Sequence, residues 1–260
     1  MQSYNTFTIR GKWSLKEFRT LEQIESIREL WQSFQQSQKH PAMQSDIDRY
    51  LSVWEAPGNS WEPCILLLCD DDVPKTLIIA HIGREPLRIK LWSKALFRPQ
   101  LNKLSIAYGG VLNCLDKTTS EILIMALKLF MHQYRLDCIH FDHLTSETFF
   151  YQEIHKAFNM LCRNHFSKID PHWRMTVPKN IDEFYAARSK KHRANLKREQ
   201  KKLESQYKEH LHIIHYRKDC NLEKIFQDAV EVSEKTYQHA LGVGFCDNTL
   251  MRSIITKDIE

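Results

Sequence analysis

The 260-residue sequence contains no apolar run approaching the roughly 20 residues that a membrane-spanning helix needs. Its longest apolar stretches, "CILLLC" and "ILIMALKLFM", are short or are interrupted by Lys128. The opening residues, "MQSYNTFTIRGKW", are polar and lack a charged segment followed by an apolar core, so no secretory signal is visible. These absences predict a cytoplasmic protein without a membrane span.

Glycine is also scarce, with seven residues in the chain, which leaves few places for a glycine-rich phosphate loop. The segment "YGGVLN" (108–113) places Gly109 and Gly110 between a predicted strand and a predicted helix, but acidic Asp116 follows and no further glycine does. This favours a structural turn, with a substrate-facing loop as the alternative. The first half of the chain is therefore not expected to bind a pyrophosphate in the usual way.

The cysteines and histidines do not form a metal-binding pattern. The seven cysteines are odd in number and irregularly spaced, which indicates reduced core thiols and not a disulfide framework or a zinc site. In "HLHIIH", His210 and His212 share one face of a predicted strand while His215 points the other way, so no metal site is predicted. In "HFDH" (140–143), Asp142 and His143 could do acid–base work at a sheet edge, although a structural role is favoured.

Against these absences, the chain has a globular composition and one concentration of positive charge. Apolar residues make up 42% and charged residues 27% of the sequence, and the net charge is +5. Residues 188–202 alone contain eight Lys or Arg and one Glu. Such a basic helix can be solvated with nothing bound, can contact an anionic substrate or cofactor, or can lie along a nucleic acid. No docking motif for base recognition accompanies it, so nucleic acid is the least expected of the three.

The hydrophobic pattern up to Pro178 predicts an α/β domain. Strands are expected at "NTFTIR", "EPCILLLCD", "KTLIIAHIGR", "LRIKLW", "KLSIAYGGVL", "LDCIHFDHL" and "HWRMTV". Two helices between the first two strands, a buried helix at "TTSEILIMALKLFMHQY" and a helix over 146–162 complete the pattern. Ser45 is expected to cap the second helix, and Thr118 with Glu121 to form a capping box at the third. This order is that of an acyltransferase fold of the GNAT type, a mixed sheet with helices on both faces.

After Pro178 the pattern restarts. One helix over 181–207, a strand near 211–217, a helix over 221–240 and a short final helix are predicted. We therefore expect two domains, a first GNAT-like domain at 1–178 and the start of a second, incomplete one at 179–260. A half-built sheet exposes a strand edge, which predicts that the chain associates with itself.

Two stretches of the second region carry a family resemblance. "FYAARSKKHRANLKREQKKLE" and "EKTYQHALGVGF" resemble the BioF2-like (CelD-like) branch of the GNAT acyltransferases, which are similar to the Fem-type aminoacyltransferases in having two GNAT domains in tandem. The shared helix signature is matched by a serine, three basic residues and an asparagine: Ser189, Arg193, Asn195, Lys197 and Arg198. The strand "PHWRMTVP" is also similar to that of the family.

The resemblance implies an acyl-CoA-dependent N-acyltransferase whose substrates are acetyl-CoA or another acyl-CoA and an amine-bearing small molecule, in cell-envelope or polysaccharide metabolism. It implies an anionic-ligand contact at Lys190, Arg193, Lys197 and Arg198, with no permanently bound cofactor and no metal, and it identifies no catalytic base. Family members continue for more than a hundred residues further, so the resemblance predicts that this chain is inactive by itself. The alternative is a non-enzymatic protein that binds nucleic acid or another polyanion through residues 188–202.

Overall fold

A computed structural model describes residues 4–55, 61–86, 89–91, 94–97, 99–159, 162–163, 169–173, 176–210, 212, 221–240, 245 and 247–259. It divides into two compact units, one formed by Met1–His165 with Leu222–Glu260 and the other by Phe166–Asn221. In the described part of the chain, no helix is both long and apolar enough to cross a membrane. The expected domain boundary at Pro178 stays a prediction.

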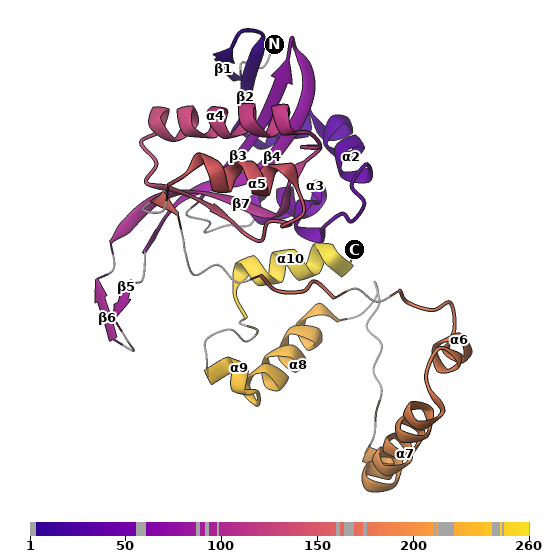
Figure 1. Cartoon of the computed structure of the whole chain (residues 1–260). Coiled ribbons are helices and arrows are strands. Elements are labelled where there is room, and N and C mark those ends of the chain that lie inside the picture. The colour runs from indigo at the N-terminus through magenta and orange to yellow at the C-terminus, as the bar shows by residue number, and fades with distance from the viewer. Residues whose placement is uncertain are drawn as a thin grey trace. The chain divides into compact units, whose positions relative to one another are not determined.

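The larger unit is built on a six-stranded mixed sheet (Figure 1). In spatial order its strands are β1 (Asn5–Arg10), β2 (Trp13–Phe18), β3 (Glu62–Asp70), β4 (Val73–Pro86), β7 (Gln100–Leu112) and β8 (Cys138–Phe141). Neighbouring strands are antiparallel except for β7 and β8, which are parallel. A separate two-stranded ribbon of β5 (Ile89–Leu91) and β6 (Lys94–Phe97) lies between β4 and β7 in the sequence. The predicted mixed sheet is thus confirmed.

Helices cover both faces of this sheet, as expected (Figure 1). On one face, α4 (Lys117–Gln133) and α5 (Phe149–Ala157) bury side chains such as Leu127, Phe130 and Phe150 against alternate residues of the strands. On the other face lie α1 (Leu21–Glu25), α2 (Arg28–Gln36) and α3 (Ile47–Glu55). Continuous apolar strands such as "CILLLC" follow from this arrangement, because both of their faces are buried.

Two predicted helix caps are wrong. α3 follows a 3₁₀ turn, η1 (Met43–Ser45), and its first turn is capped by Asp46, whose Oδ1 accepts from the Arg49 amide at 3.0 Å. α4 begins two residues earlier than the expected capping box, because Asp116 accepts from the Thr119 amide at 2.8 Å. In both places an aspartate competes with a nearby hydroxyl, and its carboxylate is the stronger acceptor for helix N–H groups.

The second region departs from its prediction in several places. The expected helix 181–207 is two helices, α6 (Ile181–Ala186) and α7 (Lys190–Tyr207), because Ser189 caps α7 by accepting from the His192 amide at 3.2 Å. α7 continues into η3 (Lys208–His210). The helix expected over 221–240 is likewise divided into α8 (Leu222–Glu234) and α9 (Tyr237–Ala240), and α10 (Thr249–Ile259) follows.

The strand expected over 172–177 is not present in its described residues, which are irregular and leave Trp173 88% and Val177 76% exposed. None of the residues that the structure describes pairs with this segment as a neighbouring strand, so the ladder hydrogen bonds of a strand are not made there. The strand expected near 211–217 lies outside the described residues, apart from His212.

Candidate functional site

The parallel strands β7 and β8 end together at a place that can hold a ligand. Their pairing runs from Lys103 with Cys138 to Ile106 with Phe141, and it closes with a hydrogen bond of 3.0 Å from the Asp142 amide to the Ile106 carbonyl. α4 connects the two strands, so β7 is antiparallel to β4 on one side and parallel to β8 on the other. Ligands in α/β sheets bind beyond the carboxyl ends of strands at such a change of connection.

β7 bulges at this point instead of ending in the predicted turn. Its pairing with β4 moves from Ala80 opposite Ile106 to Ile78 opposite Val111, which leaves extra residues on β7. Gly109 has φ +69°, and a Cβ there would lie 2.6 Å from the Ala42 Cβ. A Cβ on Gly110 would lie 2.8 Å from the carbonyl oxygens of Ala107 and of Ile79. Both glycines are therefore required by the bulge.

A histidine–carboxylate pair lies just past the end of β8. His143 Nδ1 and Asp142 Oδ1 are 2.7 Å apart, and both side chains are exposed. His143 has φ +60°, an uncommon backbone conformation for a residue other than glycine. The ring of Tyr108, from the β7 bulge, meets the His143 ring edge to face at 5.4 Å. When Nδ1 donates to Asp142, Nε2 carries a lone pair and can accept a proton.

A row of polar residues crosses the same end of the sheet. His81 on β4, Ser105 on β7 and His140 on β8 are register partners, and they lie on the face opposite the core that α4 and α5 cover. The His81 ring lies between Trp61, stacked at 4.7 Å, and Trp54 at 5.9 Å. Burial lowers the pKa of His81 to about 4, and the pKa of His140 is also lowered, first by desolvation and then by Lys103. Both imidazoles are therefore neutral near pH 7.

The beginning of α4, where a phosphate could meet helix amides, is occupied by the protein's own carboxylate. Asp116 accepts from the Thr119 amide and, at 2.7 Å, from its hydroxyl, and these hydrogen bonds lower the pKa of Asp116. An anion placed there would meet like charge and an amide that is already bonded. This geometry agrees with the expectation that the first half of the chain lacks a conventional pyrophosphate loop.

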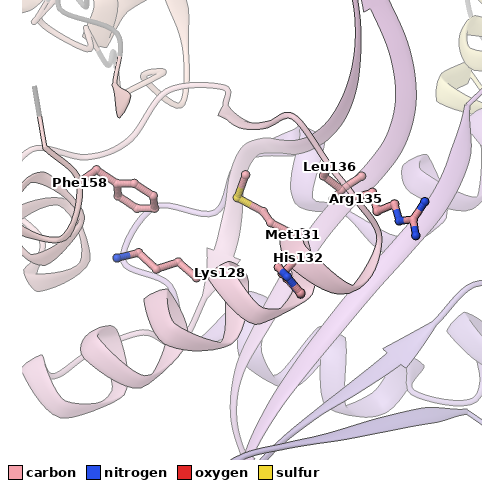
Figure 2. A pocket seen from close by; sticks show the side chains of 6 residues that line it. All are labelled: Lys128, Met131, His132, Arg135, Leu136 and Phe158. Carbon is pink, nitrogen blue, oxygen red and sulfur yellow. The ribbon is translucent and has the colours of Figure 1, made fainter. Parts of the chain in front are cut away.

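A hollow lies at the other end of β8, before the strand begins (Figure 2). It is lined by three basic and three apolar residues: Lys128, Met131, His132, Arg135, Leu136 and Phe158. The Lys128 ammonium lies 4.6 Å from the centre of the Phe158 ring and donates to the Ala157 carbonyl at 2.8 Å. The hollow is open and its lining has neither a carboxylate nor a nucleophile, so it offers less chemistry than the histidine pair.

The four basic residues predicted to bind an anion all lie on α7, in the smaller unit, and they are not equivalent. Lys190, Lys197 and Arg198 are exposed. Arg193 is half-buried, and its Nη1 donates to the Tyr185 carbonyl at 3.5 Å. Arg198 contacts Glu199 at 3.5 Å. Neither Lys190 nor Lys197 has an ion pair with the residues that the structure describes. Their role as ligand contacts stays a prediction.

Other sequence candidates receive a structural explanation. Cys64 and Cys69 are buried, and burial raises the pKa of the Cys64 thiol to about 12, so it is not a nucleophile. His215 lies outside the described residues, and among those described no three metal-binding side chains come together. Tyr108, Trp61 and His81 were not singled out from the sequence, because their association depends on register between strands.

Comparison with known proteins adds little. No family model matches the chain, and no curated protein matches it. A solved structure of the aminoglycoside N-acetyltransferase AAC(6')-Iy in complex with CoA is a distant match, with 12% sequence identity and a TM-score of 0.34. The match covers 65% of this chain and 100% of that one. A likeness of this degree does not identify a family.

Proposed function

We propose that the chain is an acyl-CoA-dependent N-acyltransferase of the GNAT type, similar to the BioF2/CelD-like branch, with its reaction site where β7 and β8 end. The proposal rests on the contact between Tyr108 and the Asp142–His143 pair at the carboxyl ends of the parallel strands β7 and β8. The six-stranded mixed sheet with helices on both faces, the arrangement expected for a GNAT-type domain, supports it.

In this reaction the acceptor amine attacks the thioester carbonyl, the new C–N bond forms and the C–S bond breaks. The amine must lose a proton, which His143 accepts on Nε2 while Asp142 holds Nδ1 and stabilises the resulting imidazolium. The proton finally goes to the CoA thiolate. Tyr108 positions the imidazole through its ring contact. The sequence alone named Asp142 and His143 only as a secondary possibility.

The beginning of α4 does not offer cations to the donor phosphates. From the family resemblance we infer that Lys190, Arg193, Lys197 and Arg198, in the smaller unit, bind an anionic ligand, because guanidinium and ammonium groups suit phosphate oxygens. The acceptor is an amine-bearing small molecule. The family resemblance suggests the metabolism of cell-envelope or polysaccharide precursors, and the cysteine pattern suggests the cytoplasm.

The experiment measures CoA release from acetyl-CoA by the 260-residue chain, with and without a panel of small primary amines. We expect amine-dependent release that falls roughly 10²- to 10⁴-fold in His143→Gln, the range for loss of a general base. His239→Gln, at another exposed histidine, is the matched control and should stay within about twofold. Release that needs no amine, or that His143→Gln leaves unchanged, would refute the assignment. Absence of any turnover would favour the inactivity that the family resemblance predicts.

A further inference from the structure

The cations of α7 are arranged on one continuous face of the helix. At 100° per residue, eight positions fall within an arc of roughly 140°, and each is either basic or small. The arc is made of six cations, one alanine and one serine: Lys190, Lys191, Ala194, Lys197, Arg198, Lys201, Lys202 and Ser205. Glu199 and Glu204 lie outside it. We call this set the cation face.

Within the cation face the charges form two rows. Lys190, Lys197 and Lys201 lie along one side, and Lys191, Arg198 and Lys202 lie along the other, roughly 100° away. The small side chains of Ala194 and Ser205 lie between the rows. The first and last cations of each row are eleven positions apart, or roughly 16 Å at 1.5 Å per residue. The result is a shallow channel of small side chains bordered by long basic ones.

Helix stability does not explain this arrangement. The first turn of α7 has basic residues and no acidic one, and its last turn has no basic residue. Cations at a helix N-terminus oppose the macrodipole at a cost of about 0.3–1 kcal/mol each. Lys197 with Lys201 and Arg198 with Lys202 are like-charge pairs at i, i+4, which also destabilise a helix. A sequence that breaks local rules in this way indicates a constraint from outside the helix.

Most of these cations have no ion-pair partner among the described residues. All six cations are exposed, and only Arg198 has an acidic neighbour, Glu199, among the residues that the structure describes. The apolar residues Leu196, Leu203 and Tyr207 lie on the opposite side of the helix. These three residues form a narrow apolar stripe, smaller than the wide apolar face that a helix lying on a bilayer buries.

We propose that the cation face, which includes three of the residues assigned above to an anionic ligand, also binds the phosphate backbone of duplex DNA. The major groove is about 12 Å wide and admits an α-helix, so the two rows can reach the phosphates on its two walls. Ala194 and Ser205 allow the helix to approach the groove between them. The face has no aromatic residue and no Asn, Gln, Asp or Glu that would read a base, and its cations contact phosphates, so binding is indifferent to sequence. Six cations also exceed what one CoA needs.

The test is fluorescence anisotropy of the full chain with a labelled 20-base-pair DNA duplex over a series of salt concentrations. Each phosphate contact contributes about −0.9 to the slope of log K against log salt. We expect a slope of about −3 to −5 for the unmodified chain. Lys190→Gln/Lys197→Gln/Lys201→Gln and Lys191→Gln/Arg198→Gln/Lys202→Gln should each make the slope shallower by two to three and weaken binding at least tenfold.

The matched control removes three exposed cations elsewhere, at Lys39, Lys117 and Lys235, and should change affinity by less than twofold. Since glutamine is as good a helix former as lysine and the substitutions relieve repulsion, circular dichroism should show α7 intact. If the control variant loses as much DNA affinity as the two row variants, then affinity depends only on net charge and the proposal is overturned. Displacement of the duplex by polyglutamate, or tighter binding to vesicles containing phosphatidylserine than to DNA, would also overturn it.

Discussion

Replacing Tyr50 by Phe removes one oxygen atom that joins α3 to the sheet beside the candidate site. Tyr50 is buried, and its hydroxyl donates to the Ala80 carbonyl at 2.6 Å and accepts from the Cys64 amide at 3.0 Å. Burial raises the pKa of Tyr50, so the hydroxyl keeps the proton that it donates. Ala80 is the residue at which the pairing between β4 and β7 is interrupted by the bulge. The hydroxyl thus supplies a partner where the ladder is disturbed.

The expected cost follows from two lost hydrogen bonds. Each is worth about 0.5–1.5 kcal/mol net, and the Ala80 carbonyl and Cys64 amide would remain buried without replacement partners. We therefore expect Tyr50→Phe to lower the free energy of unfolding by about 2 kcal/mol. In a protein of this size that corresponds to a fall in Tm of about 4–8 °C.

Urea denaturation followed by tryptophan fluorescence measures this change directly. Tyr237→Phe is the matched control, because Tyr237 is 76% exposed and the same atom is removed; it should change stability by less than about 0.5 kcal/mol. If Tyr50→Phe and Tyr237→Phe are equally mild, then the hydroxyl of Tyr50 does not hold α3 to the sheet, and the reasoning about the bulge fails.

Two further predictions concern the site. Gly110→Ala should lower the free energy of unfolding by roughly 1–3 kcal/mol, because its Cβ would press on two backbone oxygens that cannot move away. Gly11→Ala is the control: a Cβ there meets nothing within 4 Å, so only the smaller strain of its positive φ should appear. Thermal melts of both variants measure the difference. Because the pKa of His81 falls from 6.5 to about 4 on folding, the unfolded chain binds a proton first as the pH drops. The contribution of His81 to stability is therefore complete above pH 6.5 and is lost between pH 6.5 and 4, by up to about 3 kcal/mol. Urea melts across this range should show a shallower decline in stability for His81→Gln than for the unmodified chain. An identical decline would contradict the burial argument.

Much of the larger unit could be read from local pattern. Strands β3 and β4 and helix α4 can be recognised from the sequence alone. They are buried on nearly all sides, and such elements are almost entirely apolar, a composition that exposed elements do not have. The Asp142–His143 pair was visible as neighbouring residues after a predicted strand. The residue that caps each helix was harder to predict. Asp116 competes with Thr118, and Asp46 with Ser45; all four are acceptable cap residues, and the capping free energies within each pair differ by about 1 kcal/mol or less.

The sequence by itself determined which segments are buried, where charge is concentrated on α7, and that Asp142 and His143 follow a strand. Only the tertiary structure decided that Gly109 and Gly110 form a bulge inside β7, that Tyr108 meets His143, and that His81, Ser105 and His140 share a row. The physical reason is that these contacts join residues roughly 25 to 60 positions apart in the chain, and they depend on the register in which the strands pair. A shift of one residue in pairing would turn each of these side chains to the opposite face, and no local propensity records which register the packed core selects.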